Sequence, residues 1–275
     1  MAIQQGAFNP LVFGLCILTT LFLQILSNLA NDYGDSIHGA DGEHRKGPKR
    51  AVQSGIITKQ QMFKAIVIFA VLAFICGIGL LFVALETRTY LWPYFLGTGI
   101  LAIAAAILYT NGKRPYGYLG LGDISVLTFF GPVGVLGTWF LQSNDWNPWF
   151  LLPALGMGFL ATGVLNVNNV RDIESDTLAG KKSIPVIIGR KAALIYHSTL
   201  LGFGYIGMFF LFPNFGISTF LVLVLLYMHN KQMRLATSVA EYDPQLKTLS
   251  LITLASAILV LLKSLSIGFL PTFIL

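Results

Sequence analysis

Two short stretches of the sequence place carboxylates and carboxamides in a helical pattern directly after an apolar run. The polar residues of the first stretch are Asn28, Asn31, Asp32 and Asp35. They are spaced i, i+3, i+4 and i+7, so an α-helix places all of them on one face. Hard oxygen ligands of this kind suit Mg²⁺, which is bound through few carboxylates and leaves its other positions to water and phosphate. The first stretch therefore predicts a helix end that holds a divalent metal ion against a diphosphate.

The second stretch follows another apolar run and contains Asn168, Asp172 and Asp176, spaced i, i+4 and i+8. On one continuous helix these side chains form a single stripe. A carboxylate at the centre of a bilayer costs about 2.5–3.5 kcal/mol, so acidic residues beside membrane-grade sequence are rare without a function. We therefore expect the two acidic stretches to be the two halves of one metal site. The candidate metal ligands are Asn31, Asp32, Asp35, Asn168, Asp172 and Asp176.

Basic residues follow each acidic stretch. Lys49 and Arg50 follow the first, and Lys181 and Lys182 follow the second. Their side chains could complete an anion site beside the metal. The alternative interpretation is that the acidic residues end helices at the membrane interface and pair with nearby lysines and arginines. Two matched clusters on helices that run in the same direction favour the metal site.

A third polar stretch, residues 109–123, lies between the two acidic ones and mixes cations, phenols and glycines. A cation here could hold the carboxylate of a substrate, and the tyrosines could line an aromatic pocket. The alternative is a positively charged interfacial loop without a catalytic role. The candidate residues of this stretch are Tyr109, Lys113, Arg114, Tyr116 and Tyr118.

Other polar residues have simpler explanations. Asp123 begins a predicted helix, where a carboxylate is favoured by the helix dipole and the exposed N–H groups. Thr58 and Gln61 have the spacing of a capping box that opens the next helix. The histidines show no metal-ligand spacing, and no role is assigned to them.

The composition identifies the kind of protein that positions these residues. The chain has 275 residues, of which 55% are hydrophobic and 11% charged, and its mean hydropathy is +0.72. Soluble domains average about 25% charged residues, so this composition is typical of a polytopic membrane protein. Cys16 and Cys76 both lie in apolar runs, which excludes a disulfide framework and a thiolate metal site.

Apolar runs of about 20 residues, the length that spans a bilayer, predict eight transmembrane helices. They cover residues 11–30, 62–85, 90–110, 121–141, 149–168, 192–213, 214–232 and 249–271. Loops on one side of these helices, with their flanks, contain sixteen of the eighteen lysines and arginines. The positive-inside rule makes that side cytoplasmic. The net charge of +6 thus follows from membrane topology, and no nucleic-acid partner is expected.

The acidic and basic stretches together resemble a known family. Residues 31–35, 172–176 and 180–182 resemble the UbiA superfamily of intramembrane aromatic prenyltransferases. Within it, the chain is most similar to members that act on 1,4-dihydroxy-2-naphthoate in menaquinone synthesis. The stretches that carry this closer similarity are residues 24–35, 114–123 and 165–172.

The resemblance implies an all-α membrane bundle, usually of nine helices around a central cavity, that binds Mg²⁺ and a prenyl diphosphate. We expect one membrane domain over residues 1–275 that lacks the family's first helix. The superfamily pattern also has a further Asp four residues after the position of Asp35. This chain has Gly39 there and Asp41 two residues later, so Asp41 is a candidate substitute.

The activity implied by the resemblance is the transfer of a polyprenyl group from polyprenyl diphosphate to 1,4-dihydroxy-2-naphthoate, with loss of CO₂ and diphosphate. The expected place is the cytoplasmic (inner) membrane, in contact with the lipid bilayer and with the active site facing the cytoplasm. The implied catalytic residues are Asp32, Asp35, Asp172, Asp176 and Arg114. The implied substrate-binding residues are Asn28, Asn31, Lys49, Arg50, Tyr109, Lys113, Tyr116, Tyr118, Asn168, Arg171, Lys181 and Lys182.

Three alternatives stay open on the sequence. A sister prenyltransferase would use 4-hydroxybenzoate or homogentisate as the acceptor, although residues 114–123 favour the naphthoate. A cation or metabolite transporter would place ionisable groups near the midplane, whereas these acids cluster at one membrane face. A non-catalytic prenyl-lipid binding protein is the third. The sequence makes no prediction for the oligomeric state or the prenyl chain length.

Overall fold

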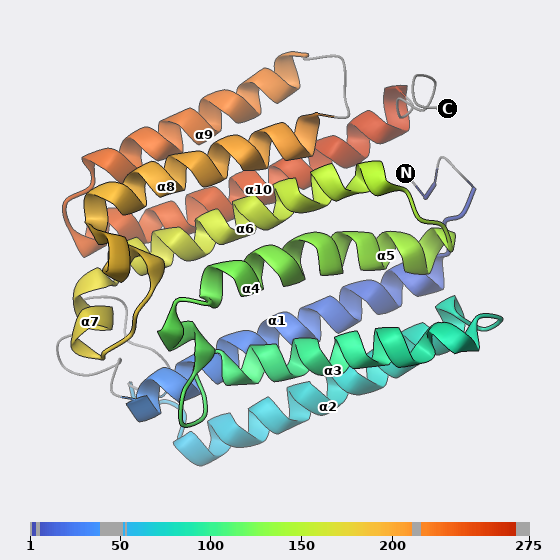
Figure 1. Cartoon of the computed structure of the whole chain (residues 1–275), viewed down its shortest axis with the longest axis horizontal. Coiled ribbons are helices and arrows are strands. Elements are labelled where there is room, and N and C mark those ends of the chain that lie inside the picture. The colour runs from blue at the N-terminus through green and yellow to red at the C-terminus, as the bar shows by residue number, and fades with distance from the viewer. Residues whose placement is uncertain (1, 4–5, 39–51, 53, 211–215, 268–275) are drawn as a thin grey trace. The chain divides into compact units, whose positions relative to one another are not determined.

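The computed structural model describes residues 2–3, 6–38, 52, 54–210 and 216–267. All regular elements among these residues are helices (Figure 1). Contacts group the chain into two compact units, each described here by itself. We call them the α1–α3 unit, which comprises Phe8–Gly122 and Glu174–Ser183, and the α4–α10 unit, which comprises Met1–Ala7, Asp123–Ile173 and Ile184–Leu275.

The α1–α3 unit packs three long antiparallel helices side by side, drawn in blue to teal in Figure 1. Its elements are α1 (Pro10–His38), α2 (Lys59–Ala84), η1 (Thr89–Leu91), α3 (Trp92–Leu108) and η2 (Tyr116–Leu119). Leu26 and Ala30 of α1 are buried against Met62 and Ile66 of α2. These contacts lie beside the first acidic stretch. They hold that end of α1 against α2.

The capping box predicted at the start of α2 is confirmed. Thr58 Oγ1 accepts a hydrogen bond from the Gln61 N–H at 3.2 Å, and the Thr58 N–H donates to Gln61 Oε1 at 2.9 Å. These two bonds satisfy N–H groups that have no partner within the helix. They mark the start of α2.

The α4–α10 unit is built around α6, which lies against α8, α10 and η3. Its elements are α4 (Gly122–Thr128), η3 (Phe129–Val133), α5 (Gly134–Ser143), η4 (Pro148–Phe150), α6 (Leu151–Arg171), α8 (Ile184–Phe209), α9 (Ile217–Leu235) and α10 (Val239–Ile267). The short helix α7 (Ile173–Leu178) starts where the two units meet in the sequence. Asp123 lies in the first turn of α4, as predicted.

Glycines bring α6 and α8 into close contact. A Cβ atom on Gly207 of α8 would lie 2.7 Å from Gly156 Cα of α6, nearer than any side chain allows. The two backbones therefore touch directly at this crossing. Around it, Leu160, Leu201 and Met208 form part of the buried core of the unit.

The prediction of an all-helical membrane protein is confirmed. Seven helical segments in the described part of the chain are long and apolar enough to cross a membrane. The described part of the predicted run at 214–232 lies in helix α9 (Ile217–Leu235), which is not among these seven, although eight spans were predicted. Its C-terminal half contains Asn230, Lys231, Gln232 and Arg234, and these polar residues lower its mean hydropathy.

Candidate functional site

The first acidic stretch forms the last turns of α1, so its polar residues share one helix, as predicted. Asp35 is buried, with 4% of its surface exposed. The Tyr118 hydroxyl donates a hydrogen bond to Asp35 Oδ1 at 3.1 Å. Asn31 and Asp32 are half-buried, and Asn28 is exposed. The structure thus joins the first acidic stretch to the polar stretch at residues 109–123.

Two side chains of that polar stretch donate hydrogen bonds to the backbone of α1. Thr110 Oγ1 and Asn111 Nδ2 each donate a hydrogen bond to the carbonyl of Ala30 at 2.9 Å. Gly34 permits this approach, since a Cβ there would lie 2.6 Å from the Thr110 carbonyl oxygen. The residue before Asp35 must therefore be small for the loop to reach the carboxylate.

The tyrosines of this stretch differ in what they contact. The rings of Tyr109 and Tyr116 pack edge to face at 5.4 Å, and the Tyr116 hydroxyl donates to the Ala105 carbonyl at 2.9 Å. These contacts shape the loop, whereas Tyr118 reaches the carboxylate of Asp35. Lys113 and Arg114 are exposed on the same loop. Their roles in binding substrate stay predictions.

Lys181 links Asp176, a carboxylate of the second acidic stretch, to Tyr118 within the α1–α3 unit. Asp176 is 4% exposed, and Lys181 Nζ lies 3.3 Å from each of its carboxylate oxygens. The same Nζ lies 5.9 Å from the centre of the Tyr118 ring. The backbone N–H of Lys182 donates to the Tyr118 carbonyl at 3.1 Å. Asp35, Tyr118, Lys181 and Asp176 therefore form one cluster, which we call the Tyr118 cluster.

The prediction that Asn168, Asp172 and Asp176 form one stripe of one helix is wrong. Helix α6 ends at Arg171, and Asp172 has φ −97° and ψ 11°, outside the helical region. A new short helix, α7, begins at Ile173 and carries Asp176. The helix break at Asp172 separates the two carboxylates, which belong to different units.

Arg171 gathers the polar residues at the end of α6 (the Arg171 cluster). Its Nε and Nη2 donate to Asp172 Oδ1 and Oδ2, each at 2.8 Å. Nη2 also donates to Asn168 Oδ1 at 2.6 Å, and Nη1 donates to Asp243 Oδ1 at 2.7 Å. The guanidinium is buried and is engaged by residues of its own chain. Its predicted role in binding the acceptor stays a prediction.

Sequence reasoning missed Asp243, which lies 72 residues from Arg171 in the chain. It also missed the hydrogen bond from the Tyr196 hydroxyl to Asp123 Oδ2, at 2.9 Å. The buried pair His197–His229, with Nε2 atoms 3.0 Å apart, is a third such contact. Each joins separate helices, so no local spacing reveals it. The available signal for Asp243 was its place in a loop assigned to the same membrane side as the acidic stretches.

The residue types of the two acidic stretches, carboxylates and carboxamides, are ones that bind Mg²⁺. Asp35, Asp172 and Asp176 are buried carboxylates, and the buried Asn169 Oδ1 accepts no hydrogen bond within the described part of the chain. Buried polar oxygens are normally satisfied, so such an oxygen is available to a ligand. No three acidic, His or Cys residues among those described lie close enough to hold a metal ion. Lys49, Arg50 and Asp41 lie outside the described residues.

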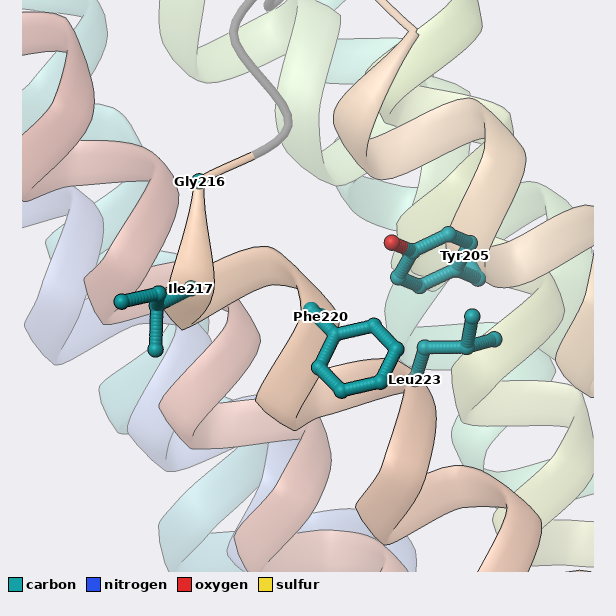
Figure 2. A pocket seen from close by; sticks show the side chains of 5 residues that line it. All are labelled: Tyr205, Gly216, Ile217, Phe220 and Leu223. Atoms are coloured by element: carbon teal, nitrogen blue, oxygen red, sulfur yellow. The ribbon is translucent and has the colours of Figure 1, made fainter.

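One pocket in the described structure lies on α8 and α9, well away in sequence from the predicted site (Figure 2). Its volume is about 380 Å³. It is lined by Tyr205, Gly216, Ile217, Phe220 and Leu223. The Tyr205 hydroxyl donates to the Thr219 carbonyl at 3.2 Å, and the other lining side chains are apolar. None of the predicted site residues contributes to this pocket.

Solved structures of related fold exist. The chain superposes on an apo UbiA homolog from Aeropyrum pernix K1 with a TM-score of 0.66 and 16% identity, covering 93% of this chain and 90% of that one. It superposes on a UbiA homolog from Archaeoglobus fulgidus, bound to DMAPP and Mg²⁺, with a TM-score of 0.56 and 17% identity, covering 92% and 88%. These likenesses show the fold.

Sequence comparison identifies the family. The chain is 51% identical over 201 residues to the 1,4-dihydroxy-2-naphthoate octaprenyltransferase of Escherichia coli, covering 73% of this chain and 65% of that one. It is 50% identical over 197 residues to the enzyme of the same name from Haemophilus influenzae, covering 72% and 63%. The chain thus spans less than two thirds of the length of these curated relatives. The pattern of the UbiA prenyltransferase family matches residues 1–257, so the chain belongs to that family.

Proposed function

We propose that the protein transfers a polyprenyl group from polyprenyl diphosphate to 1,4-dihydroxy-2-naphthoate, releasing CO₂ and diphosphate, in menaquinone synthesis. The observation that carries this proposal is the Tyr118 cluster. It places a carboxylate of each acidic stretch beside a lysine and a phenol in one compact unit. Relatives at 50% and 51% identity have the corresponding name, which supports the choice of acceptor.

The bond changes of this reaction define what the site must do. The allylic C–O bond of the donor breaks, and its electron pair leaves with the diphosphate. A new C–C bond forms between the allylic carbon and the ring carbon that carries the acceptor carboxylate. That carboxylate then leaves as CO₂, and the electrons of its C–C bond restore the aromatic ring. The site must therefore stabilise a leaving anion and hold a carboxylated ring.

The residues proposed to hold Mg²⁺ are Asn31, Asp32, Asp35, Asn168, Asp172 and Asp176. When bound, Mg²⁺ supplies Lewis-acid stabilisation to the negative charge that grows on the leaving diphosphate. A homolog of the same fold binds both DMAPP and Mg²⁺, which supports this assignment.

The chain's own cations act on the same anion. Asp176 and the Tyr118 ring hold the Lys181 ammonium in place, and Lys182 follows it with an exposed side chain. Positioned cations stabilise developing negative charge without having to reorganise during the reaction. We assign diphosphate binding to Lys181 and Lys182 for this reason.

Arg114 is the residue proposed to hold the acceptor carboxylate. It is exposed and lies four residues before Tyr118 in the same polar stretch. A guanidinium binds a carboxylate through two parallel hydrogen bonds and so orients the attached ring. The excess of lysine and arginine in the loops on one side of the predicted helices supports a site that faces the cytoplasm in the inner membrane.

A turnover assay with the purified chain in detergent tests the proposal. The assay supplies polyprenyl diphosphate, 1,4-dihydroxy-2-naphthoate and Mg²⁺, and follows both CO₂ and the prenylated product. We expect product that EDTA abolishes and Mg²⁺ restores. Competition with 4-hydroxybenzoate and homogentisate should leave the naphthoate as the preferred acceptor. A preference for either competitor, or product formation unaffected by EDTA, would contradict the proposal.

A further inference from the structure

We propose that the contact between α8 and α9 opens in acid, because the buried imidazoles of His197 and His229 share a hydrogen bond that is lost when both rings are protonated. Their Nε2 atoms lie 3.0 Å apart, and the two residues are 0% and 2% exposed. All the contacts concerned lie within the α4–α10 unit. The inference concerns a conformational change of the fold and does not depend on the proposed reaction.

Side-chain hydrogen bonds help to hold α9 against its neighbours. This helix is not among the seven segments that are long and apolar enough to cross a membrane. His229 lies less than about two turns before its end at Leu235. Beside the histidine pair, Ser198 Oγ of α8 donates to Asn230 Oδ1 of α9 at 2.9 Å. The polar end of α9 is therefore held by a few specific contacts, and the histidine pair is the most buried of them.

The hydrogen-bond partners determine which ring nitrogens carry hydrogen. His229 Nδ1 lies 3.2 Å from Gln245 Oε1 of α10, and a carbonyl oxygen only accepts. His229 Nδ1 is therefore the donor, which leaves Nε2 as the acceptor of that neutral ring. His197 Nε2 must then donate across the 3.0 Å contact. The remaining nitrogen, His197 Nδ1, is an acceptor without a partner among the described residues.

The reverse order of donors is less favourable. If the amide nitrogen of Gln245 donated to His229 Nδ1, each hydrogen bond along the chain would reverse. His197 Nδ1 would then carry a buried hydrogen without an acceptor in the described structure. Buried N–H groups without a partner are rarer than acceptors without one. The neutral pair therefore holds one hydrogen between its two Nε2 atoms.

No charged side chain among the described residues contacts either ring. Helix α6 presents Gly163, where a Cβ would lie 4.0 Å from His197 Cε1. The titratable side chains that lie nearest along the other three helices are Tyr196 on α8, Lys231 and Arg234 on α9, and Glu241, Tyr242 and Lys247 on α10. Each of them makes a hydrogen bond elsewhere or is exposed. Glu241, the carboxylate of this set, is exposed and accepts from the Thr237 N–H at 2.6 Å. Protons added to the pair therefore meet no counter-ion.

Protonation of both rings removes the contact. Each ring then carries hydrogen on both of its nitrogens, so neither Nε2 can accept. Two N–H groups and two positive charges would face each other across 3.0 Å in a buried place, which is strongly unfavourable. Separated rings that reach water take up protons at about pH 6.5. Because separated rings bind more protons than paired rings, a fall in pH favours separation and a rise restores the contact.

Electron paramagnetic resonance between two spin labels measures the opening directly. The labels are attached to Thr199→Cys on α8 and Lys231→Cys on α9, both exposed positions, in the full chain in detergent. Cys16→Ser and Cys76→Ser remove the native thiols. We expect one short, narrow distance distribution at about pH 7.5 and a longer, broader one at about pH 5.5, on either side of the ordinary histidine value. Return to the higher pH should restore the first distribution.

Variants that do not titrate in this range identify the groups responsible. Glutamine both donates and accepts, so His197→Gln and His229→Gln each allow a hydrogen bond to the remaining imidazole. In either variant the distance distribution should be the same at both pH values. His38→Gln, which removes a histidine of α1, is the matched control and should leave the native response unchanged.

Thermal unfolding gives a second measurement on the same chains without labels. The unfolding midpoint of the native chain and of His38→Gln should fall by about 3 °C between the two pH values, and that of either pair variant should fall by less. A label distance in the native chain that does not change with pH would overturn the inference. A pH response that persists in both His197→Gln and His229→Gln would also overturn it, since other groups would then carry the change.

Discussion

The two acidic stretches are positioned by different physical means. In the first, Asp32 and Asp35 lie in the continuous helix α1, so the backbone alone sets their spacing. In the second, the helix ends at Arg171, and Asp172 leaves the helical region. There the carboxylates are oriented by cations, with Arg171 on Asp172 and Lys181 on Asp176.

This difference predicts how strongly each acidic stretch responds to substitution of the residues that contact its carboxylates. In the first stretch, the loss of one neighbouring hydrogen bond should matter little, because the backbone of α1 still sets the direction of each carboxylate. An oriented ion pair depends on the shape of its partner, and breaking a buried pair leaves an uncompensated charge. We therefore expect substitutions of partner residues to damage the second stretch more than the first.

The largest effect should come from the carboxylates themselves, and it should be equal in the two stretches. Asp35→Asn and Asp172→Asn keep the side-chain shape and remove the negative charge. Each should lower the rate of product formation by at least about 100-fold, because charge stabilisation of the leaving group dominates such reactions. Initial rates at saturating substrates measure this, with Glu86→Gln as the control. A variant that keeps more than a tenth of the native rate would show that one stretch is dispensable.

Arg171→Lys should have the next largest effect. Lysine keeps the charge, yet its ammonium cannot span both oxygens of Asp172 together with Asn168 and Asp243. We expect about a tenfold or greater loss of kcat/KM, comparable to the loss of other buried charge-assisted bonds. Steady-state kinetics at several Mg²⁺ concentrations measure it. Native kinetics in this variant would mean that helix geometry, and not Arg171, positions the second stretch.

Tyr118→Phe tests the first stretch in the matching way. It removes the hydroxyl that donates to Asp35 and keeps the ring beside Lys181. Because α1 still aims Asp35, the half-saturating Mg²⁺ concentration should rise only about threefold, as expected for one hydrogen bond. A loss of kcat/KM in this variant larger than that caused by Arg171→Lys would contradict the expected difference between the two stretches.

Thr58→Ala should have the smallest effect on the site. It removes the cap of α2 and should lower the free energy of unfolding by about 1 kcal/mol. The Mg²⁺ dependence of turnover should stay native, since the cap lies outside both clusters. Unfolding followed by circular dichroism in detergent measures the stability change. A shifted Mg²⁺ dependence would imply that the start of α2 takes part in metal binding.

The sequence predicted those parts of the molecule that follow from local pattern. The apolar runs predicted the long helices, and the spacing around Asp35 predicted one helical face because α1 continues to His38. The capping box at Thr58 is a local motif and was found in the same way.

The parts that were missed depend on tertiary packing. No glycine or proline marks the helix break at Asp172, so the pattern there favours a helix that the structure interrupts. Arg171 meets Asp243, and Tyr118 meets Asp35, across 72 and 83 residues of sequence. Such contacts exist only once α6 lies against α10, and once the loop after α3 lies against α1. Local sequence patterns therefore do not show which residues meet in these contacts.

The central proposal is that binding of Mg²⁺ and diphosphate needs the carboxylates of both acidic stretches. Mn²⁺ binding in the presence of polyprenyl diphosphate, measured for the native chain, Asp35→Ala, Asp172→Ala and the double variant, tests it most directly. We predict that each single variant loses the high-affinity site, and that the double variant binds no more weakly than either, since the two stretches act as a unit. A single variant that binds Mn²⁺ as tightly as the native chain would contradict the claim.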